Sequence, residues 1–97
     1  MREKRRYIYF KIELGRNLTE TEARDEIYRA ILSFAGEFGF SKASPKLIEF
    51  RDNSGVLLCS NAETQKVKAA LALVGRIKGE EGCIRVLRVS GMMCKLR

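Results

Sequence analysis

The chain has 97 residues, a net charge of +7, 45% hydrophobic residues and no histidine. This length fits one compact domain, so a single domain over residues 1–97 is expected. The longest apolar run, residues 69–74, is far shorter than the roughly 20 residues of a membrane span. A soluble, cytoplasmic protein without membrane contact is therefore expected. The missing histidine excludes Ser/His and Cys/His catalysis, and three widely spaced cysteines without a CxxC pair indicate neither disulfides nor zinc.

The basic excess lies at the two ends of the chain. Residues 1–6 have four basic side chains against one acidic, residues 76–97 have six against two, and the region between has nine of each sign. We expect a basic N-terminal arm, residues 1–6, and a short basic tail, residues 92–97. Clustered positive charge favours a polyanion, and nucleic acid is the first candidate. The alternative is that these ends only keep the protein in solution.

The first strand is predicted over residues 7–14, which alternate apolar and polar side chains. Residues 46–50 and 56–59 predict two further strands that form a hairpin. In the turn between them, Asn53 and Gly55 tolerate a positive φ.

Two helices are predicted between the strands. The first starts at a capping box formed by Thr19 and Glu22, and Gly36 and Gly39 weaken and end it. The second starts at the N-cap Asn61 and ends at Gly79. Their predicted buried stripes are Ala23, Ile27, Ala30, Ile31, Phe34 and Phe38 in the first helix, and Val67, Ala70, Leu71, Val74 and Ile77 in the second.

The last predicted strand covers residues 83–89 and contains an irregularity. Arg85 and Arg88 are three residues apart, so they share one face of a strand only if an extra residue is inserted between them. A β-bulge near Val86 or Leu87 would achieve this while the apolar residues stay inside.

The element order is strand, helix, strand, strand, helix, strand. It predicts an α+β, ferredoxin-like (RRM-like) βαββαβ fold, with two helices on one face of a four-stranded antiparallel sheet. The other face stays open and carries Tyr7 and Tyr9 from the first strand. From the third strand it carries either Val56 and Leu58 or Leu57 and Cys59. An apolar open face indicates that a partner docks on it.

Two features typical of RNA-binding domains have simpler interpretations in this sequence. The third strand lacks the aromatic residues of RRM domains, so only Tyr7 and Tyr9 remain for base stacking, and a protein interface is favoured on this face. The GxxG sequences at 36–39 and 79–82 have acidic centres that would repel phosphate, so they are interpreted as helix-ending glycines.

Four segments resemble a known family. They are Lys-Arg-Arg-Tyr-Ile-Tyr-Phe-Lys at 4–11, the hairpin over 46–59, Val-Lys-Ala-Ala-Leu-Ala-Leu-Val at 67–74 and Val-Leu-Arg-Val-Ser-Gly at 86–91. In this order they resemble archaeal ribonuclease P protein component two, the family called "processing of precursor five" in eukaryotes. The resemblance implies a ferredoxin-like, non-catalytic subunit of the ribonucleoprotein that removes the 5′ leader of precursor tRNA.

The resemblance also implies cofactors and partners. The protein binds no cofactor, and Mg²⁺ serves the ribonuclease P RNA, which performs the hydrolysis. The expected partners are that RNA, precursor tRNA and a larger TIM-barrel-like subunit, component three, with a homodimer inside a heterotetramer as one form of the assembly.

No residue is predicted to be catalytic or to bind a metal, and the predicted RNA-binding residues are basic. They are Arg2, Lys4, Arg5, Arg6, Lys11, Arg85, Arg88, Lys95 and Arg97. Tyr7, Tyr9, Val56 and Leu58 are predicted to stack on bases or to form the partner interface. One alternative is a ferredoxin-like regulatory module that binds a protein or small ligand without RNA. A metal-dependent nuclease would need clustered acidic residues, which the sequence does not indicate.

Overall fold

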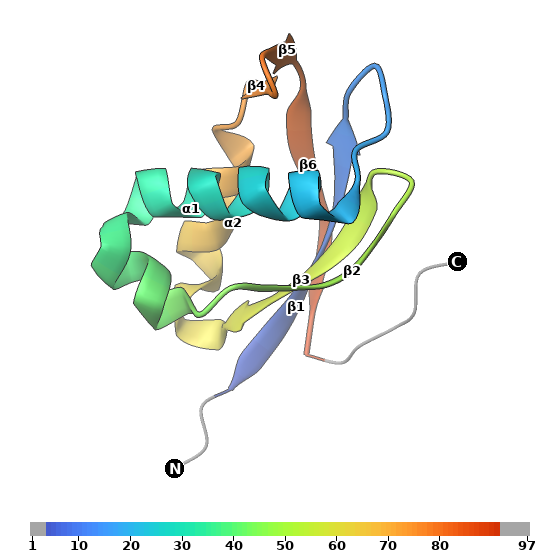
Figure 1. Cartoon of the computed structure of the whole chain (residues 1–97). Coiled ribbons are helices and arrows are strands. Elements are labelled where there is room, and N and C mark those ends of the chain that lie inside the picture. The colour runs from blue at the N-terminus through green and yellow to red at the C-terminus, as the bar shows by residue number, and fades with distance from the viewer. Residues whose placement is uncertain (1–3, 92–97) are drawn as a thin grey trace.

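The computed structural model describes residues 4–91 and has a helical layer packed on one face of an antiparallel sheet (Figure 1). The strand order is β2-β3-β1-β6, so the predicted ferredoxin-like α+β fold is confirmed. None of the helices formed by residues 4–91 combines the length and hydropathy of a transmembrane segment. In chain order the elements are β1 (Arg5–Glu13), α1 (Glu20–Ala43), β2 (Lys46–Arg51), β3 (Ser54–Ser60), the 3-10 helix η1 (Asn61–Glu63), α2 (Thr64–Ala72), β4 (Arg76–Ile77), β5 (Glu80–Glu81) and β6 (Cys83–Ser90).

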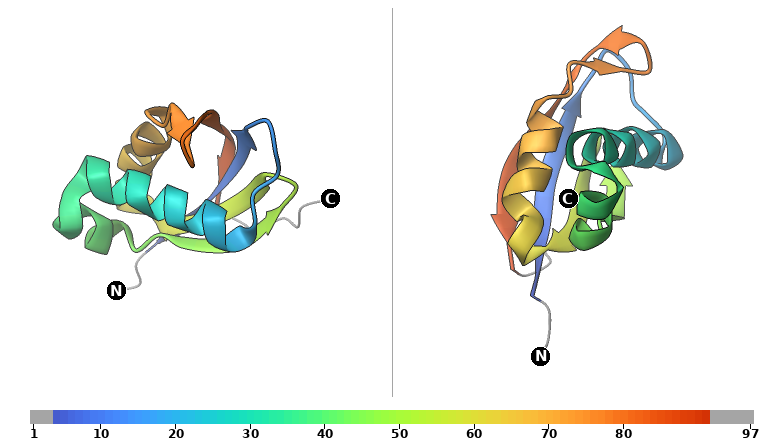
Figure 2. Two further views of the ribbon diagram at one scale, coloured as in Figure 1. Left: turned by 45° about the horizontal axis from the view of Figure 1, so that its top comes forward. Right: turned by 90° about the vertical axis from the view of Figure 1, so that its left-hand side faces the viewer.

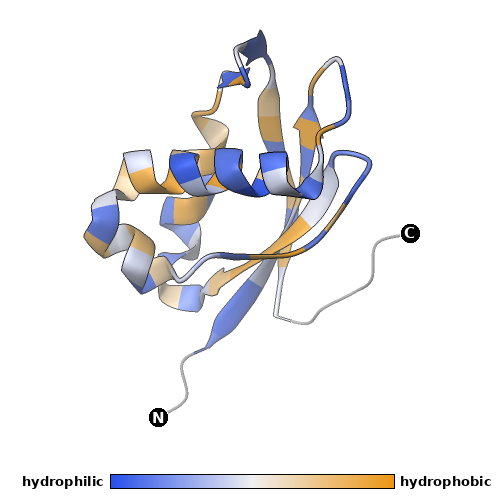
Figure 3. Cartoon of the chain, in the orientation of Figure 1, coloured by the Kyte–Doolittle hydropathy of each residue, from blue (hydrophilic) through white to orange (hydrophobic). Residues whose placement is uncertain are grey.

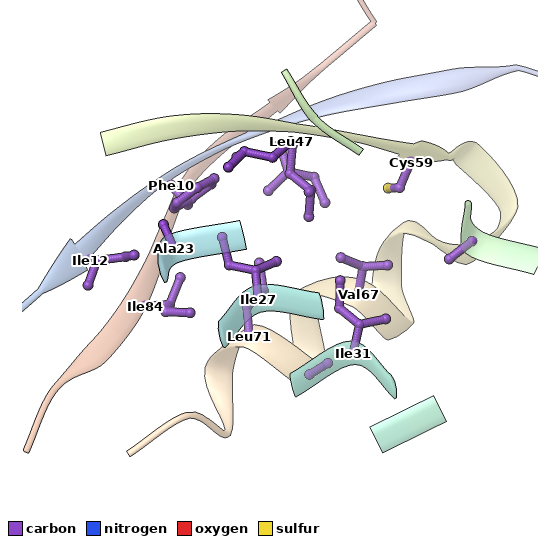
Figure 4. Close-up of a cluster of buried hydrophobic side chains, with 14 of the residues drawn as sticks. Phe10, Ile12, Ala23, Ile27, Ile31, Leu47, Cys59, Val67, Leu71 and Ile84 are labelled. Carbon is purple, nitrogen blue, oxygen red and sulfur yellow. The ribbon is translucent and has the colours of Figure 1, made fainter. Parts of the chain in front are cut away.

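The core lies between the inner face of the sheet and the two helices. Both helices lie in front of the sheet when the molecule is viewed from the helical side (Figure 2, right). Alternation along β1 points Ile8, Phe10 and Ile12 inward, where they are at most 1% exposed. They meet Ile27 of α1 and Leu71 of α2, and the close-up shows the strand and helix side chains facing one another (Figure 4).

The predicted bulge in β6 is confirmed. Tyr9 lies opposite Arg88 and Phe10 lies opposite Val86, which leaves Leu87 as the extra residue. The extra residue shifts the alternation of inward and outward side chains by one position. Arg85 and Arg88 therefore both lie on the outer face, while Val86 packs against the core.

The turn between β2 and β3 differs in detail from the prediction. Positive φ angles occur at Asp52 (51°) and Asn53 (61°), the pair required by a two-residue type I′ turn. Gly55 does not have a positive φ, so that part of the prediction was wrong. Asn53 also fixes the neighbouring loop, because its side chain accepts from Leu18 N and donates to Arg16 O.

The predicted start of α1 is confirmed, but its end and buried stripe were partly wrong. Thr19 Oγ1 accepts from Glu22 N (3.2 Å) and Glu22 Oε1 accepts from Thr19 N (3.0 Å), which completes the capping box. The helix kinks at Gly36, where φ is 77°, and continues to Ala43. The exposed fractions of Phe34 and Phe38 are 46% and 75%. Phe38 is exposed because the kink at Gly36 interrupts the helical periodicity, so that residues after the kink no longer continue the buried face of the helix.

The second helix is shorter than predicted. It ends at Ala72, and the residues expected to extend it form the β4–β5 hairpin, which projects beyond the sheet in Figure 1. Lys78 (φ 52°) and Gly79 (φ 80°) make its two-residue turn. Ile77 is fully buried as predicted, but from a strand. Asn61 is not an N-cap either, since it lies within η1.

Candidate nucleic-acid interface

The open sheet face is formed by the side chains that alternate with the core residues. In β1 these are Tyr7, Tyr9 and Lys11, as predicted. In β3, Leu58 lies opposite Tyr7 and Val56 lies opposite Tyr9. The two alternatives for β3 are thereby resolved in favour of Val56 and Leu58, because the residues between them belong to the core.

Tyr9 offers little of its own ring surface to a ligand. Its exposed fraction is 5%, and the guanidinium of Arg88 lies 4.5 Å from the ring centroid. Val56 beside it is fully buried, whereas Tyr7 and Leu58 are partly exposed. At this point the outer face of the sheet therefore presents an arginine stacked on an aromatic ring.

A hollow of about 340 Å³ adjoins this stacked pair. Its lining comprises Tyr9, Phe10, Arg51, Asp52, Ser54, Gly55, Leu87 and Arg88. Arg51 was not predicted here, because it lies one residue beyond the strand expected over residues 46–50. β2 also contains a second bulge: Leu47 pairs with Leu57 but Glu49 pairs with Val56. The inserted Ile48 allows both Leu47 and Phe50 to face the core, and Arg51, which follows Phe50, lies on the outer face opposite Ser54.

Lys11 and Arg85 lie side by side near the end of β1 on the same face. Arg85 Nη2 is 2.7 Å from Glu13 Oε1, in an ion pair whose side chains are both substantially exposed. Such a pair is weak, so the Arg85 guanidinium can exchange its carboxylate for a phosphate. The side chain of Lys11 is exposed.

The basic residues at the start of β1 occupy the opposite end of the sheet, where the ribbon is strongly hydrophilic (Figure 3). Arg5 and Arg6 are part of β1 rather than of a separate arm. Arg5 Nη2 donates to Ser44 O (3.0 Å), and Arg6 Nε donates to Asn61 Oδ1 (2.8 Å). Lys4 is exposed next to them. The other predicted RNA-binding residues, Arg2, Lys95 and Arg97, lie outside the described residues.

The largest exposed apolar side chains gather mainly on the helices. Leu73 is 71% exposed and lines a groove between α1 and α2 together with Phe34 and Val74. On the sheet side, Leu87 is the one large apolar residue among positions 4–91 with comparable exposure, at 56%. The surface suited to a protein partner thus includes the helical layer, where Phe34 was expected to be buried.

The metal-binding residue types and the two described cysteines do not form a cluster within residues 4–91. Among residues 4–91, no three His, Cys, Asp or Glu side chains come close enough to hold a metal ion. Burial raises the pKa of the Cys59 thiol, which lies in the core and interacts with Thr64 Oγ1 at 3.8 Å.

Comparison with known proteins identifies the family. A profile of the Rpp14/Pop5 family matches residues 6–97. The chain belongs to the Rpp14/Pop5 family. It is 35% identical over 99 residues to Ribonuclease P protein component 2 of Pyrococcus furiosus, covering 100% of this chain and 82% of the relative. It is 38% identical over 97 residues to the protein of the same name from Methanocaldococcus jannaschii, covering 100% and 72%.

A solved structure extends the comparison to the fold. A chain in the cryo-EM structure of yeast Ribonuclease MRP superposes with a TM-score of 0.80 and covers 100% of this chain and 81% of the yeast chain. At 12% identity this likeness concerns the fold alone. The family resemblance found in the sequence is confirmed, and membership in the Rpp14/Pop5 family supports a subunit role in ribonuclease P.

Proposed function

We propose that this chain is a non-catalytic, RNA-binding subunit of ribonuclease P that supports the catalytic RNA in removing the 5′ leader of precursor tRNA. The observation that carries this proposal is the match to archaeal ribonuclease P components over the whole chain. In this role the RNA and its Mg²⁺ ions perform the hydrolysis. The protein supplies positive charge and binds no cofactor of its own.

The described basic residues form two groups that suit phosphate contacts. Lys4, Arg5 and Arg6 lie at one end of the sheet, and Lys11, Arg85 and Arg88 lie on its open face. Arg2, Lys95 and Arg97 complete the proposed set. Phosphates of a folded RNA repel one another, and basic side chains that neutralise them reduce the need for Mg²⁺. Tyr7 and Leu58 provide partly exposed apolar contact area between the two groups.

The test is cleavage of precursor tRNA at limiting Mg²⁺. The reaction contains the cognate ribonuclease P RNA and the larger TIM-barrel-like subunit, with and without this chain. Cleavage should increase sharply when the chain is added. If the Pyrococcus furiosus component 2 stimulates an otherwise identical reaction and this chain does not, the proposed function is wrong.

The helical groove favours a second candidate, a protein-binding module. Leu73 and Phe34 expose apolar surface that a partner protein would cover, and in the proposed assembly this partner is the larger subunit. Leu73→Glu should abolish binding of that subunit and leave affinity for RNA intact. If Leu73→Glu abolishes function while the pair Arg5→Ala and Arg6→Ala has no effect, the module that acts without RNA is the better description.

A further inference from the structure

The hollow on the open face has the size of a small-ligand site. Its volume of about 340 Å³ is at the lower end of the roughly 300–1,000 Å³ typical of such pockets. That space suits one nucleotide and is too small for a duplex. The hollow also lies where β6 bulges at Leu87, so its shape follows from the same insertion that brings Arg88 to this face.

Arg88 provides a flat surface in the wall of this hollow. One side of its guanidinium lies over the Tyr9 ring, which holds the plane in position. RNA-binding proteins stack unpaired bases on arginine planes as well as on aromatic rings. A plane already held by an aromatic neighbour loses less conformational freedom when a base binds.

The other walls provide a charge for phosphate and groups for the edge of a base. Arg51 is exposed at the end of β2 and supplies a second guanidinium. Asp52 and Ser54 contribute polar groups at the rim, and Leu87 contributes apolar surface. Two arginines against one aspartate make the hollow attractive to an anion that carries a flat, hydrogen-bonding ring.

We propose that this hollow binds one unpaired nucleotide of an RNA, with its base stacked on the Arg88 guanidinium and its phosphate at Arg51. This inference rests on the proposed RNA-binding function and adds a specific site to it. It also replaces the expected stacking on Tyr9 with stacking on Arg88, while Tyr9 positions the arginine. Because stacking requires an accessible base face, the site selects single-stranded RNA over a helix.

The decisive variant is Arg88→Lys, which keeps the positive charge and removes the plane. The full-length chain is titrated against two fluorescently labelled probes, an octaadenylate RNA and an eight-residue RNA backbone without bases. The native chain should bind octaadenylate more tightly than the abasic backbone. Arg88→Lys should weaken octaadenylate binding about fivefold or more and leave abasic binding unchanged.

The matched control is Arg24→Lys, the same exchange at an exposed position of α1 in the helical layer. It should bind both probes as the native chain does. Because charge is conserved, both variants should keep the native dependence on salt concentration. Unfolding curves of all three proteins verify that the exchanges leave the fold intact.

The outcomes separate this site from the proposed function. If Arg88→Lys binds both probes as tightly as the native chain while salt-sensitive RNA binding persists, the nucleotide site is wrong and the RNA-binding role remains. If Arg88→Lys weakens both probes equally, Arg88 contributes charge and does not stack, which also overturns the site. If the native chain binds neither these probes nor ribonuclease P RNA, the proposed function itself fails.

Discussion

Gly55 shows how a single residue determines the packing of two strands. A Cβ at this position would lie 2.7 Å from Glu49 O and 2.7 Å from Cζ of Phe10. The Phe10 ring occupies the space that a side chain would take, and it stacks on Phe50 with centroids 6.3 Å apart. The glycine is therefore required by close approach rather than by an unusual backbone angle, and this reason cannot be read from a local turn pattern.

The variant Gly55→Ala should lower the free energy of unfolding by about 1–3 kcal/mol, because the methyl group has to displace backbone or the ring of Phe10. Urea unfolding followed by circular dichroism measures the change. The control is Gly15→Ala, whose Cβ would meet no atom within 4 Å. Equal stability of the two variants would contradict the assigned role of Gly55.

The β4–β5 hairpin depends on a contact from α1. The Glu26 side chain is largely buried, with Oε1 accepting from Lys78 N at 3.0 Å and Oε2 lying 2.9 Å from Arg29 Nη1. Arg16 adds an exposed link, with Nε donating to Glu80 Oε2 at 2.9 Å. The hairpin is thus attached to α1 by a buried carboxylate, and to the loop between β1 and α1 by a surface ion pair.

Replacing Glu26 by alanine should lower stability by about 1–3 kcal/mol, because Lys78 N loses its acceptor in a partly buried site. Hydrogen exchange of the Lys78 amide should accelerate more than that of amides in β1. Asp25→Ala removes an exposed carboxylate from the same helical turn and serves as the control. Unchanged protection at Lys78 in Glu26→Ala would show that the hairpin does not depend on this contact.

The start of α1 gives a prediction for acid stability. The Thr19 backbone N–H, and then the charge of Arg16 3.7 Å away, lower the pKa of Glu22 below its ordinary value of 4.5. A lowered folded-state pKa means that the stabilisation exists above the unfolded pKa and is lost as pH falls through the folded one. Glu22→Gln should therefore be less stable than the native chain at pH 7.

That difference in unfolding free energy should shrink as the pH falls below about 4.5, once the native carboxylate takes up a proton. Urea unfolding of both proteins at a series of pH values measures it. A difference that is the same at pH 7 and at pH 3 would mean that the ionised carboxylate does not stabilise the helix.

Some features of the strands can be predicted from the sequence, and others cannot. Alternation along β1 was enough to place Tyr7, Tyr9 and Lys11 outside, and two arginines three apart exposed the bulge in β6. The bulge in β2 has no such marker, and Arg51 was missed because the predicted strand ended one residue before it. The hairpin over residues 76–81 could not be identified from spacing either. Ile77 continues the helical repeat of apolar residues, and the turn that reverses the chain depends on the positive φ angles of Lys78 and Gly79.

The positive charge of the described residues extends over the molecule in two groups, one at an end of the sheet and one along its open face. The start of β1 lies beside the end of β6, since Tyr7 pairs with Ser90. Lys4, Arg5 and Arg6 lie at this end of the sheet because they begin β1, while Arg85 and Arg88 of β6 lie along its open face. An RNA that contacts both groups has to extend along the strands of the sheet.

Contacts to about four to six phosphates predict that log affinity for ribonuclease P RNA falls against log salt with a slope of about −3 to −5. Replacing Arg5 and Arg6 together by alanine should reduce the steepness by about 1.5 to 2, if both contact phosphates. Filter binding at several salt concentrations gives these slopes. A nearly flat dependence would contradict the electrostatic part of the proposed function.

The position of β1 in the sheet also affects how the chain folds. This strand lies between β3 and β6, and its register with β6 joins Tyr7 to Ser90 and Glu13 to Cys83. On the ribosome, one edge of β1 therefore stays without its neighbour until the last described strand has been synthesised. Pairing between such distant segments slows folding and leaves a strand edge open to aggregation meanwhile. A nascent chain that pauses before Cys83 would be the form most in need of a chaperone.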